Sequence, residues 1–330
     1  MAEFFVGVTA IMIVFLFGSV GEIITEKSGH LNLGTPGIMC MGGAGAMIGT
    51  GIAIAISGGT ENVVNGEFSI FIGIIFPLIF GILLAGLTGL LYCFVVDTLR
   101  CNQNITGLII TTLGAGLYQF IGTALYPSDD LERYAYTEIA RTCFKSFLPD
   151  EFVQANWFTE IFFNHGFLFY IAIAIAIVAF FIIKKTRVGL SLRAVGESPS
   201  TSDASGVNVT RYKYVATLIG SVIAGLGGIY YFLELRNGSA EYSIEAYGWI
   251  AVALVIFSIW NTGLSLAGSF IFATLYQLVD KSNAVGWINE IIKLTPYFVT
   301  IVVLIIVALF KKRETQPPSA LGLSYYREDR

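Results

Sequence analysis

The chain has 330 residues, of which 55% are apolar and 13% are charged. Soluble domains carry about 45–50% apolar and about 25% charged residues, so this composition excludes a soluble globular protein. It also excludes a disordered chain, which is poor in apolar residues and rich in charge. The net charge is −4, and the basic block Lys311-Lys312-Arg313 is short, so we expect no nucleic-acid partner.

Stretches without charged residues mark the expected membrane spans, because a charge inside the bilayer costs about 2.5–3.5 kcal/mol on insertion scales. The backbone in lipid must satisfy its own hydrogen bonds, so each span is expected to be a helix. The window 246–279 is too long for one helix and contains the turn signal Asn261-Thr262-Gly263, which divides it. The prediction is an all-α integral membrane protein of about nine transmembrane helices, with eight to ten open, near residues 4–21, 37–57, 70–96, 105–126, 163–183, 214–233, 247–260, 264–280 and 294–310.

Basic residues predict the orientation. The loops on the C-terminal side of nine spans hold 1, 1, 6 and 5 Lys and Arg, which is 13 of the 19 in the chain. The positive-inside rule then places the C-terminus in the cytoplasm and the N-terminus outside. We expect one transmembrane domain over residues 1–313 and a cytoplasmic tail over 314–330. The outer loop 127–162 is long enough for one or two short surface helices.

Metal and enzyme chemistry are not expected. The four cysteines form no C-x-x-C pair, and His30 and His165 are the only histidines. The sequence lacks H-E-x-x-H, G-x-S-x-G and a Walker loop. Apart from Asp280, at the last position of the span 264–280, no charged residue lies inside a predicted span. This disfavours a proton-coupled secondary carrier but leaves coupling through backbone carbonyls open.

The fourth predicted span carries uncharged polar groups. We take Asn104, Thr111, Tyr118 and Gln119 as candidates for a solute path, and the spacing predicts that the last three lie near one face. Amides, hydroxyls and aromatic rings suit a neutral, ring-bearing solute that forms hydrogen bonds. The alternative is that these groups bond to their own helix or to a neighbouring helix.

The inner loop 184–213 contains the signature of a short helix. Ser198 is a candidate N-cap, Pro199 suits the first helical position and Asp203 lies early in the helix. Gly206 is placed to end this helix of about seven residues in the left-handed conformation. Such a helix can transmit motion to a docked subunit. The alternative is a polar loop whose basic residues only fix the topology.

Residues 189–199 read GLSLRAVGESP, and 205–209 read SGVNV. They resemble the inner loop of ABC-importer permeases of the branched-chain amino acid and simple-sugar group, G-x-x-x-R-A-V-G-E-N-P followed by a short helix and G-I/V. Ser198 stands where Asn is usual, and both residues cap helices. The resemblance implies that this loop docks on an ATPase subunit, with the coupling residues Arg193, Gly196, Glu197, Ser198, Pro199, Asp203 and Gly206.

Two further stretches support the resemblance, which covers about residues 8–310. Residues 21–34 resemble the G-x-x-x-S-E-R-S-G-V-x-N-I-G segment of nucleoside-type permeases, although the E-G-M-M that usually follows is absent. Residues 248–253 and 260–263 resemble G-Y-I-G-I-A and W-N-P-x-G, with Thr262 in place of Pro. The motif residues are Glu26, Gly29, Asn32, Gly34, Trp260 and Asn261.

The resemblance implies a type II ABC-importer-like permease in a bacterial plasma (inner) membrane, of the shorter of two types that often pair as a heterodimer. The implied partners are a second permease chain, an ABC ATP-binding subunit that holds ATP and Mg, and an external substrate-binding lipoprotein. This chain is expected to bind no cofactor and to have no catalytic residue. The implied solute is a nucleoside; a simple sugar such as ribose, or riboflavin, remains open. A stand-alone secondary carrier is the alternative from a different class.

Overall fold

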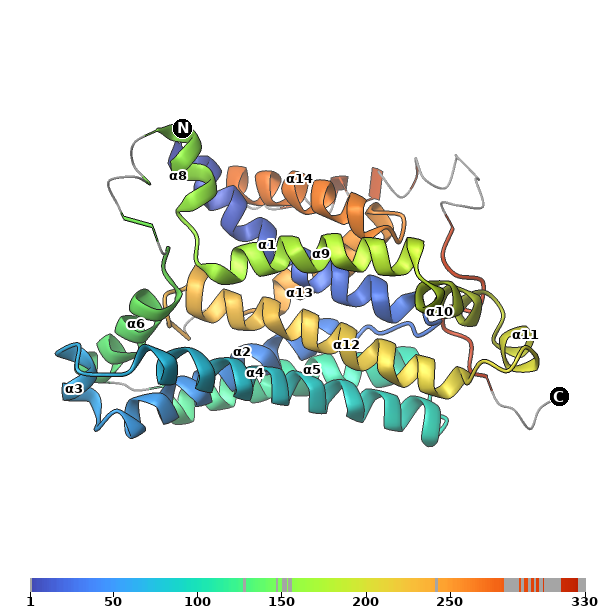
Figure 1. Ribbon diagram of the computed structural model, residues 1–330, viewed down its shortest axis with the longest axis horizontal. Coiled ribbons are helices and arrows are strands. Elements are labelled where there is room, and N and C mark those ends of the chain that lie inside the picture. The colour runs from blue at the N-terminus through green and yellow to red at the C-terminus, as the bar shows by residue number, and fades with distance from the viewer. Residues whose placement is uncertain are drawn as a thin grey trace.

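The computed structural model describes residues 2–126, 129–146, 148–149, 153, 156–240, 243–281, 316–325 and the scattered positions 291, 294–295, 298–299, 301–302 and 305. Within these residues all regular structure is helical, as predicted (Figure 1). Seven helices are long and apolar enough to cross a membrane. They are α1 (Ala2–Glu26), α2 (Thr35–Ile56), α4 (Ile70–Cys93), α5 (Gln103–Leu125), α9 (Phe167–Lys185), α12 (Val209–Tyr230) and α14 (Thr262–Asp280).

Two predicted spans need comment. The prediction near 247–260 corresponds to α13 (Glu245–Phe257), an apolar helix of 13 residues that is too short to count among the seven. The prediction at 294–310 falls largely outside the described residues. Two π-helical turns, η1 (Phe94–Thr98) and η2 (Tyr231–Leu235), lengthen α4 and α12.

Five short helices lie at the ends of the long ones. The outer loop 127–162 contains α6 (Asp130–Phe144) and α8 (Trp157–Phe163), which confirms the expectation of surface helices there, and α3 (Thr60–Val64) lies near α6. The inner loop 184–213 contains α10 (Arg187–Glu197) and α11 (Pro199–Ala204). Figure 1 places these two groups at opposite ends of the molecule.

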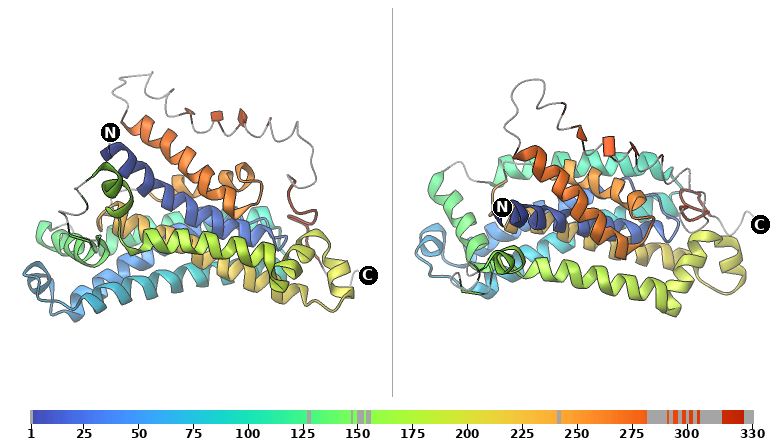
Figure 2. Two further views of the ribbon diagram at one scale, coloured as in Figure 1. Left: turned by 45° about the horizontal axis from the view of Figure 1, so that its top comes forward. Right: turned by 90° about the horizontal axis from the view of Figure 1, so that it is seen from above.

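Helices α1, α2 and α12 form the interior of the bundle. More than 70% of the most apolar window of each is buried, compared with 28% in α4 and α5. Glycines permit this close packing. A Cβ on Gly42 of α2 would lie 2.2 Å from the carbonyl oxygen of Gly225 on α12, so the two backbones are in direct contact. Figure 2 shows α1 enclosed between α14 and the layer of α9 and α12.

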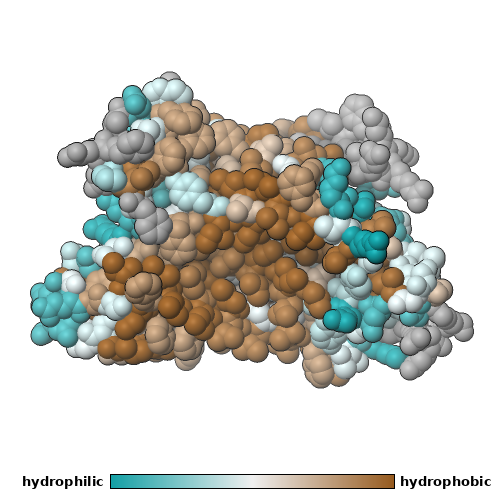
Figure 3. All heavy atoms as spheres, in the orientation of Figure 1, coloured by the Kyte–Doolittle hydropathy of each residue, from teal (hydrophilic) through white to brown (hydrophobic). Residues whose placement is uncertain are grey.

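An apolar band crosses the middle of the surface, and hydrophilic residues gather at its two ends (Figure 3). This distribution fits a bilayer around the middle of the bundle, because apolar surface of this extent is unfavourable in water. Large apolar side chains on α4, such as Phe71 and Leu87, are exposed. Both α4 and α5 bury little of their apolar surface within the chain, as helices that face lipid can do.

Several helices extend past the predicted spans, and charged residues lie in the added turns. Helix α1 continues five residues past the predicted end and includes Glu22 and Glu26. Asp97 lies in η1 and Glu234 in η2. Glu22 is 1% exposed and Glu26 is 3% exposed, so both side chains are buried within the protein. Hydrogen bonds to polar partners there offset the free-energy cost of removing a carboxyl group from water.

Candidate functional site

The inner loop 184–213 forms a pair of helices, α10 and α11, where the sequence predicted one. Thr186 caps α10, and its Oγ1 accepts a hydrogen bond of 3.1 Å from the backbone N of Gly189. Helix α10 buries Leu192 and Val195 against the bundle and ends at Glu197. The preceding sequence K-K-T-R with a Thr cap is the signal that could have revealed this helix.

The predicted short helix is present as α11. Ser198 is extended at its N-cap, with φ −151° and ψ 93°, and Pro199 occupies its first turn. The Ser198 Oγ contacts the Oγ1 of Thr201 at 2.8 Å rather than a backbone N–H. Gly206 follows the helix with a φ of 86°, so the expected left-handed end is confirmed.

The C-terminal residues 318–325, which we name the strap, bind three of the predicted coupling residues. The Oγ of Ser319 donates to Glu197 Oε2 at 2.7 Å. The hydroxyl of Tyr325 donates to Asp203 Oδ2 at 3.0 Å. The backbone N of Ala320 donates to the carbonyl oxygen of Gly196 at 2.9 Å. The sequence prediction placed this segment in a tail outside the transmembrane domain, but it packs on α10 and α11.

The strap also reaches the motif segment that follows α1. The backbone N of Gly322 donates to the carbonyl oxygen of Gly29 at 3.1 Å. Gln103, at the start of α5, joins the two segments: its Nε2 donates to the carbonyl oxygen of Leu323 at 3.4 Å, and its Oε1 accepts from the backbone N of Leu31 at 2.8 Å. The α10–α11 pair, the motif segment and α5 are therefore tied to one another through residues 318–325.

Within the motif segment, Asn32 shapes the entry to α2. Its Oδ1 accepts from the backbone N of Gly34 at 2.9 Å, which makes a tight turn just before the helix. Its backbone N donates to Glu22 Oε1 at 3.2 Å, and the hydroxyl of Thr35 donates to Glu22 Oε2. Sequence analysis missed Glu22, although it precedes Glu26 by one helical turn.

The two motifs that lie more than 200 residues apart in sequence meet at Glu26. The indole Nε1 of Trp260 donates to Glu26 Oε2, and both side chains are buried. Trp260 has a φ of 50°, which is uncommon for a residue other than glycine. Asn261 then caps α14, because its Oδ1 accepts from the backbone N of Gly263 at 3.0 Å. Arg193 lies at the same end, half-buried, with a buried Nε that has no hydrogen-bond partner among the described residues.

His30 occupies the centre of a buried polar cluster. Its Nδ1 lies 2.8 Å from Thr217 Oγ1 and its Nε2 lies 3.0 Å from Asp97 Oδ1. Burial lowers the pKa of His30, against the opposing effect of Asp97. One ligand atom each of His30, Cys93 and Asp97 lies within 4.8 Å of the others, but both ring nitrogens already have protein partners, so the contacts are explained without a metal ion.

The four solute-path candidates divide between two faces of α5, so the prediction that Thr111, Tyr118 and Gln119 share a face was wrong. Thr111 and Tyr118 are buried. The Thr111 hydroxyl donates to the carbonyl oxygen of Leu33 at 2.7 Å, and the Tyr118 hydroxyl has no partner among the described residues. Asn104 and Gln119 lie on the exposed face instead, because close packing of α5 on α2 fixes the rotation of the helix.

Comparison with known proteins identifies the family. The family described as Branched-chain amino acid transport system / permease component matches residues 4–308. The chain is 29% identical to TsgC13 of Haloferax volcanii, an ABC transporter permease protein whose name gives glucose as its solute, over 96% of this chain and 94% of that protein. It is 27% identical to the nucleoside ABC transporter permease protein NupC of Lactococcus lactis, over 94% and 93%. It is 26% identical to the guanosine ABC transporter permease protein NupQ of Bacillus subtilis, over 63% and 65%. The chain is a multi-pass membrane protein that belongs to the branched-chain amino acid transport system permease family.

Proposed function

We propose that this permease forms half of the membrane path of an ATP-driven nucleoside importer and couples to an ATP-binding subunit through α10 and α11. The observation that carries the proposal is the α10–α11 pair, which stands at one end of the bundle and is tied to the motif segment. ATP and Mg belong to the partner subunit in this proposal, and this chain binds no cofactor and catalyses no reaction.

The proposal includes nine membrane crossings, with α13 and the segment 294–310 added to the seven long helices. The N-terminal end of α1 and the strap lie at opposite ends of the bundle (Figure 1). A chain whose two ends lie on opposite sides of the membrane crosses it an odd number of times, which fits nine crossings. The α10–α11 end carries the six Lys and Arg of the inner loop, so this end faces the cytoplasm. Residues 1–313 form the permease domain, and 314–330 form the cytoplasmic segment that contains the strap.

The exposed face of α5 is the surface that we assign to the solute path and the second permease chain. Asn104 and Gln119 make no side-chain hydrogen bond within the described part of the chain, so their amide groups are available to a solute. Gly116, between them, has no atom within 4 Å of an added Cβ. An external binding protein delivers the solute to the opposite end of the bundle.

A nucleoside is favoured over a sugar because the relatives NupC and NupQ are named for nucleoside and guanosine transport, and because residues 21–34 match the nucleoside-type motif. A sugar importer is the second candidate, supported by the name of the Haloferax volcanii relative. Uptake of radiolabelled guanosine by cells that express the whole importer, in competition with unlabelled uridine, ribose or glucose, distinguishes the two.

The test of coupling uses the same uptake assay. We expect Arg193→Glu and Gly206→Val to abolish uptake while the chain stays in the membrane, because the first reverses a charge at the docking pair and the second forces a β-branched residue into a left-handed conformation. The matched control is Lys281→Glu, a charge reversal beyond the end of α14, which should transport normally. Normal uptake in both test variants would refute the assignment of this loop.

A further inference from the structure

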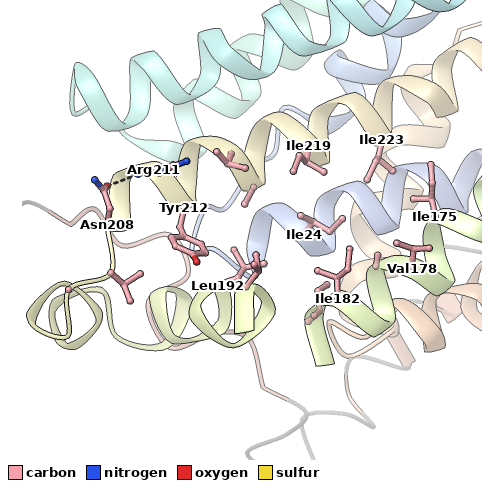
Figure 4. A pocket seen from close by; sticks show the side chains of 17 residues that line it. Ile24, Ile175, Val178, Ile182, Leu192, Asn208, Arg211, Tyr212, Ile219 and Ile223 are labelled. Carbon is pink, nitrogen blue, oxygen red and sulfur yellow. Dashed lines mark hydrogen bonds between the residues drawn. The ribbon is translucent and has the colours of Figure 1, made fainter. Parts of the chain in front are cut away.

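An apolar groove of about 810 Å³ runs along the surface between α9, α10 and α12. Figure 4 shows its walls: Ile175, Val178 and Ile182 project from α9, Ile219 and Ile223 from α12, and Ile24 lies at its floor. Val178 is 53% exposed and Ile219 is 47% exposed, so the groove opens outward into the apolar band of the surface.

One end of the groove is polar and basic. Arg211 and Tyr212 line it at the start of α12, beside Asn208 (Figure 4). The Asn208 side chain binds the backbone N of Arg211 at 2.9 Å, and the exposed guanidinium forms no ion pair with the described residues. Lys184 and Arg187, both exposed, lie where α9 ends and α10 begins, at the same end of the bundle.

The length of the groove fits one leaflet of a bilayer. Arg211 and Ile223, at its two ends, lie on the same helix and are separated by about 18 Å at a rise of 1.5 Å per residue. Half of the hydrocarbon core of a bilayer is about 15 Å thick. An acyl chain in the groove would therefore end near Ile223 when its headgroup lies beside Arg211.

We propose that this groove is a binding site for an anionic phospholipid of the leaflet at the α10–α11 end, with an acyl chain along α9 and α12 and the phosphate beside Arg211. The apolar walls match the chain, and the cationic end matches the headgroup, because guanidinium groups bind phosphate by charge-assisted hydrogen bonds. The inference goes beyond the proposed function, since it needs neither a nucleoside nor an ATPase.

The bound lipid touches the proposed coupling pair directly. Leu192 of α10 and residues 206–208, which join α11 to α12, belong to the lining of the groove. A lipid in this position packs beneath α10 and against the turn at Gly206. The site therefore links the composition of the membrane to the position of α10 and α11.

The experiment places a fluorescent reporter in the groove. Val178→Trp is made in the full chain, which is reconstituted in phosphatidylcholine vesicles that contain equal amounts of either brominated phosphatidylglycerol or brominated phosphatidylcholine. Emission of the native tryptophans, measured in the parent chain, is subtracted. The matched control is Leu91→Trp on α4, because Leu91 is exposed and lies seven residues before the end of η1, as Val178 lies seven before the end of α9.

We expect phosphatidylglycerol to quench the reporter at residue 178 more strongly than phosphatidylcholine does, and the two lipids to quench equally at residue 91. Adding Arg211→Gln should lower the preference for phosphatidylglycerol over phosphatidylcholine at residue 178 by up to about fivefold. This is the effect expected for the loss of one basic residue near an anionic membrane surface. Equal quenching by both lipids at residue 178, or a preference that survives Arg211→Gln, would overturn the proposal. Absence of quenching by either lipid would show that a second protein chain covers the groove, which also overturns it.

Discussion

The two faces of α5 are built in opposite ways. On the inner face Gly37 and Gly114 bring the backbones of α2 and α5 together, with a Cβ on Gly114 only 2.3 Å from the carbonyl oxygen of Gly37. On the outer face Gly116, two residues away, meets nothing within 4 Å. The inner polar side chain Thr111 has a protein partner, whereas the outer side chains Asn104 and Gln119 have none among the described residues. The inner face is therefore packed within the chain, whereas the outer face is exposed at Asn104, Gly116 and Gln119.

The largest expected effect comes from placing the same side chain on each of these faces. Gly114→Val should prevent stable folding, because an overpacked side chain costs about 1–3 kcal/mol even where side chains can move, and here the obstacle is backbone. Gly116→Val should change the free energy of unfolding by no more than about 0.5 kcal/mol. Thermal unfolding of the purified variants in detergent, followed by size-exclusion chromatography, measures both.

The comparison fails if Gly116→Val destabilises the isolated chain as strongly as Gly114→Val, because the outer face would then be packed within the chain. It is sharpened if Gly116→Val leaves the isolated chain stable and reduces recovery of the assembled importer. That result would show that the outer face of α5 meets the partner permease.

A smaller effect is expected where the two distant motifs meet. Trp260→Phe removes the hydrogen bond to Glu26 and leaves a buried carboxyl group without that donor, which should lower the free energy of unfolding by about 1–3 kcal/mol. Trp249→Phe is the matched control, because the Trp249 indole makes a longer bond of 3.4 Å to Glu245 in a partly exposed position. Chemical unfolding in mixed micelles measures the free energy of unfolding of both variants. An equal loss of stability in the two variants would mean that the hydrogen bond to Glu26 adds no stability of its own.

The smallest effect is expected at the strap. Tyr325→Phe removes one hydrogen bond at the surface, worth about 0.5–1.5 kcal/mol, and should loosen residues 318–325 without unfolding the bundle. Hydrogen exchange of the strap and of α11, followed by mass spectrometry, should increase together. Ser324→Ala, at an exposed neighbouring position, is the control and should exchange as the parent does. Faster exchange in the strap alone would show that it does not hold α11.

Much of the fold follows from local sequence. Each of the seven long helices overlaps one of the predicted spans. Pro199 and Gly206 set the limits of α11, because proline and glycine act through backbone geometry that needs no distant partner. The family was predicted from short motifs, and the match over residues 4–308 confirms it.

The remaining features depend on contacts that the sequence does not display. The end of α1 was misplaced because Glu22 and Glu26 are tolerated only through Thr35, Asn32 and Trp260, which come from other segments. The faces of α5 were misassigned because packing on α2 decides which side of α5 is buried. The residue types of Thr111 and Gln119 do not show that the first is buried and the second is exposed. The strap was missed because Ser319 and Tyr325 are ordinary surface residues until α10 and α11 lie beside them.

The strap has a consequence for the biosynthesis of the protein. Gly322 follows Gly29 by 293 residues, yet the two are hydrogen-bonded. Since a ribosome makes the chain from its N-terminus, the motif segment, α10 and α11 wait in the membrane until the strap emerges. A chain that terminates early can insert most of its helices but cannot close this end. The hydrogen bonds at this end of the bundle therefore depend on completion of the chain as far as the strap.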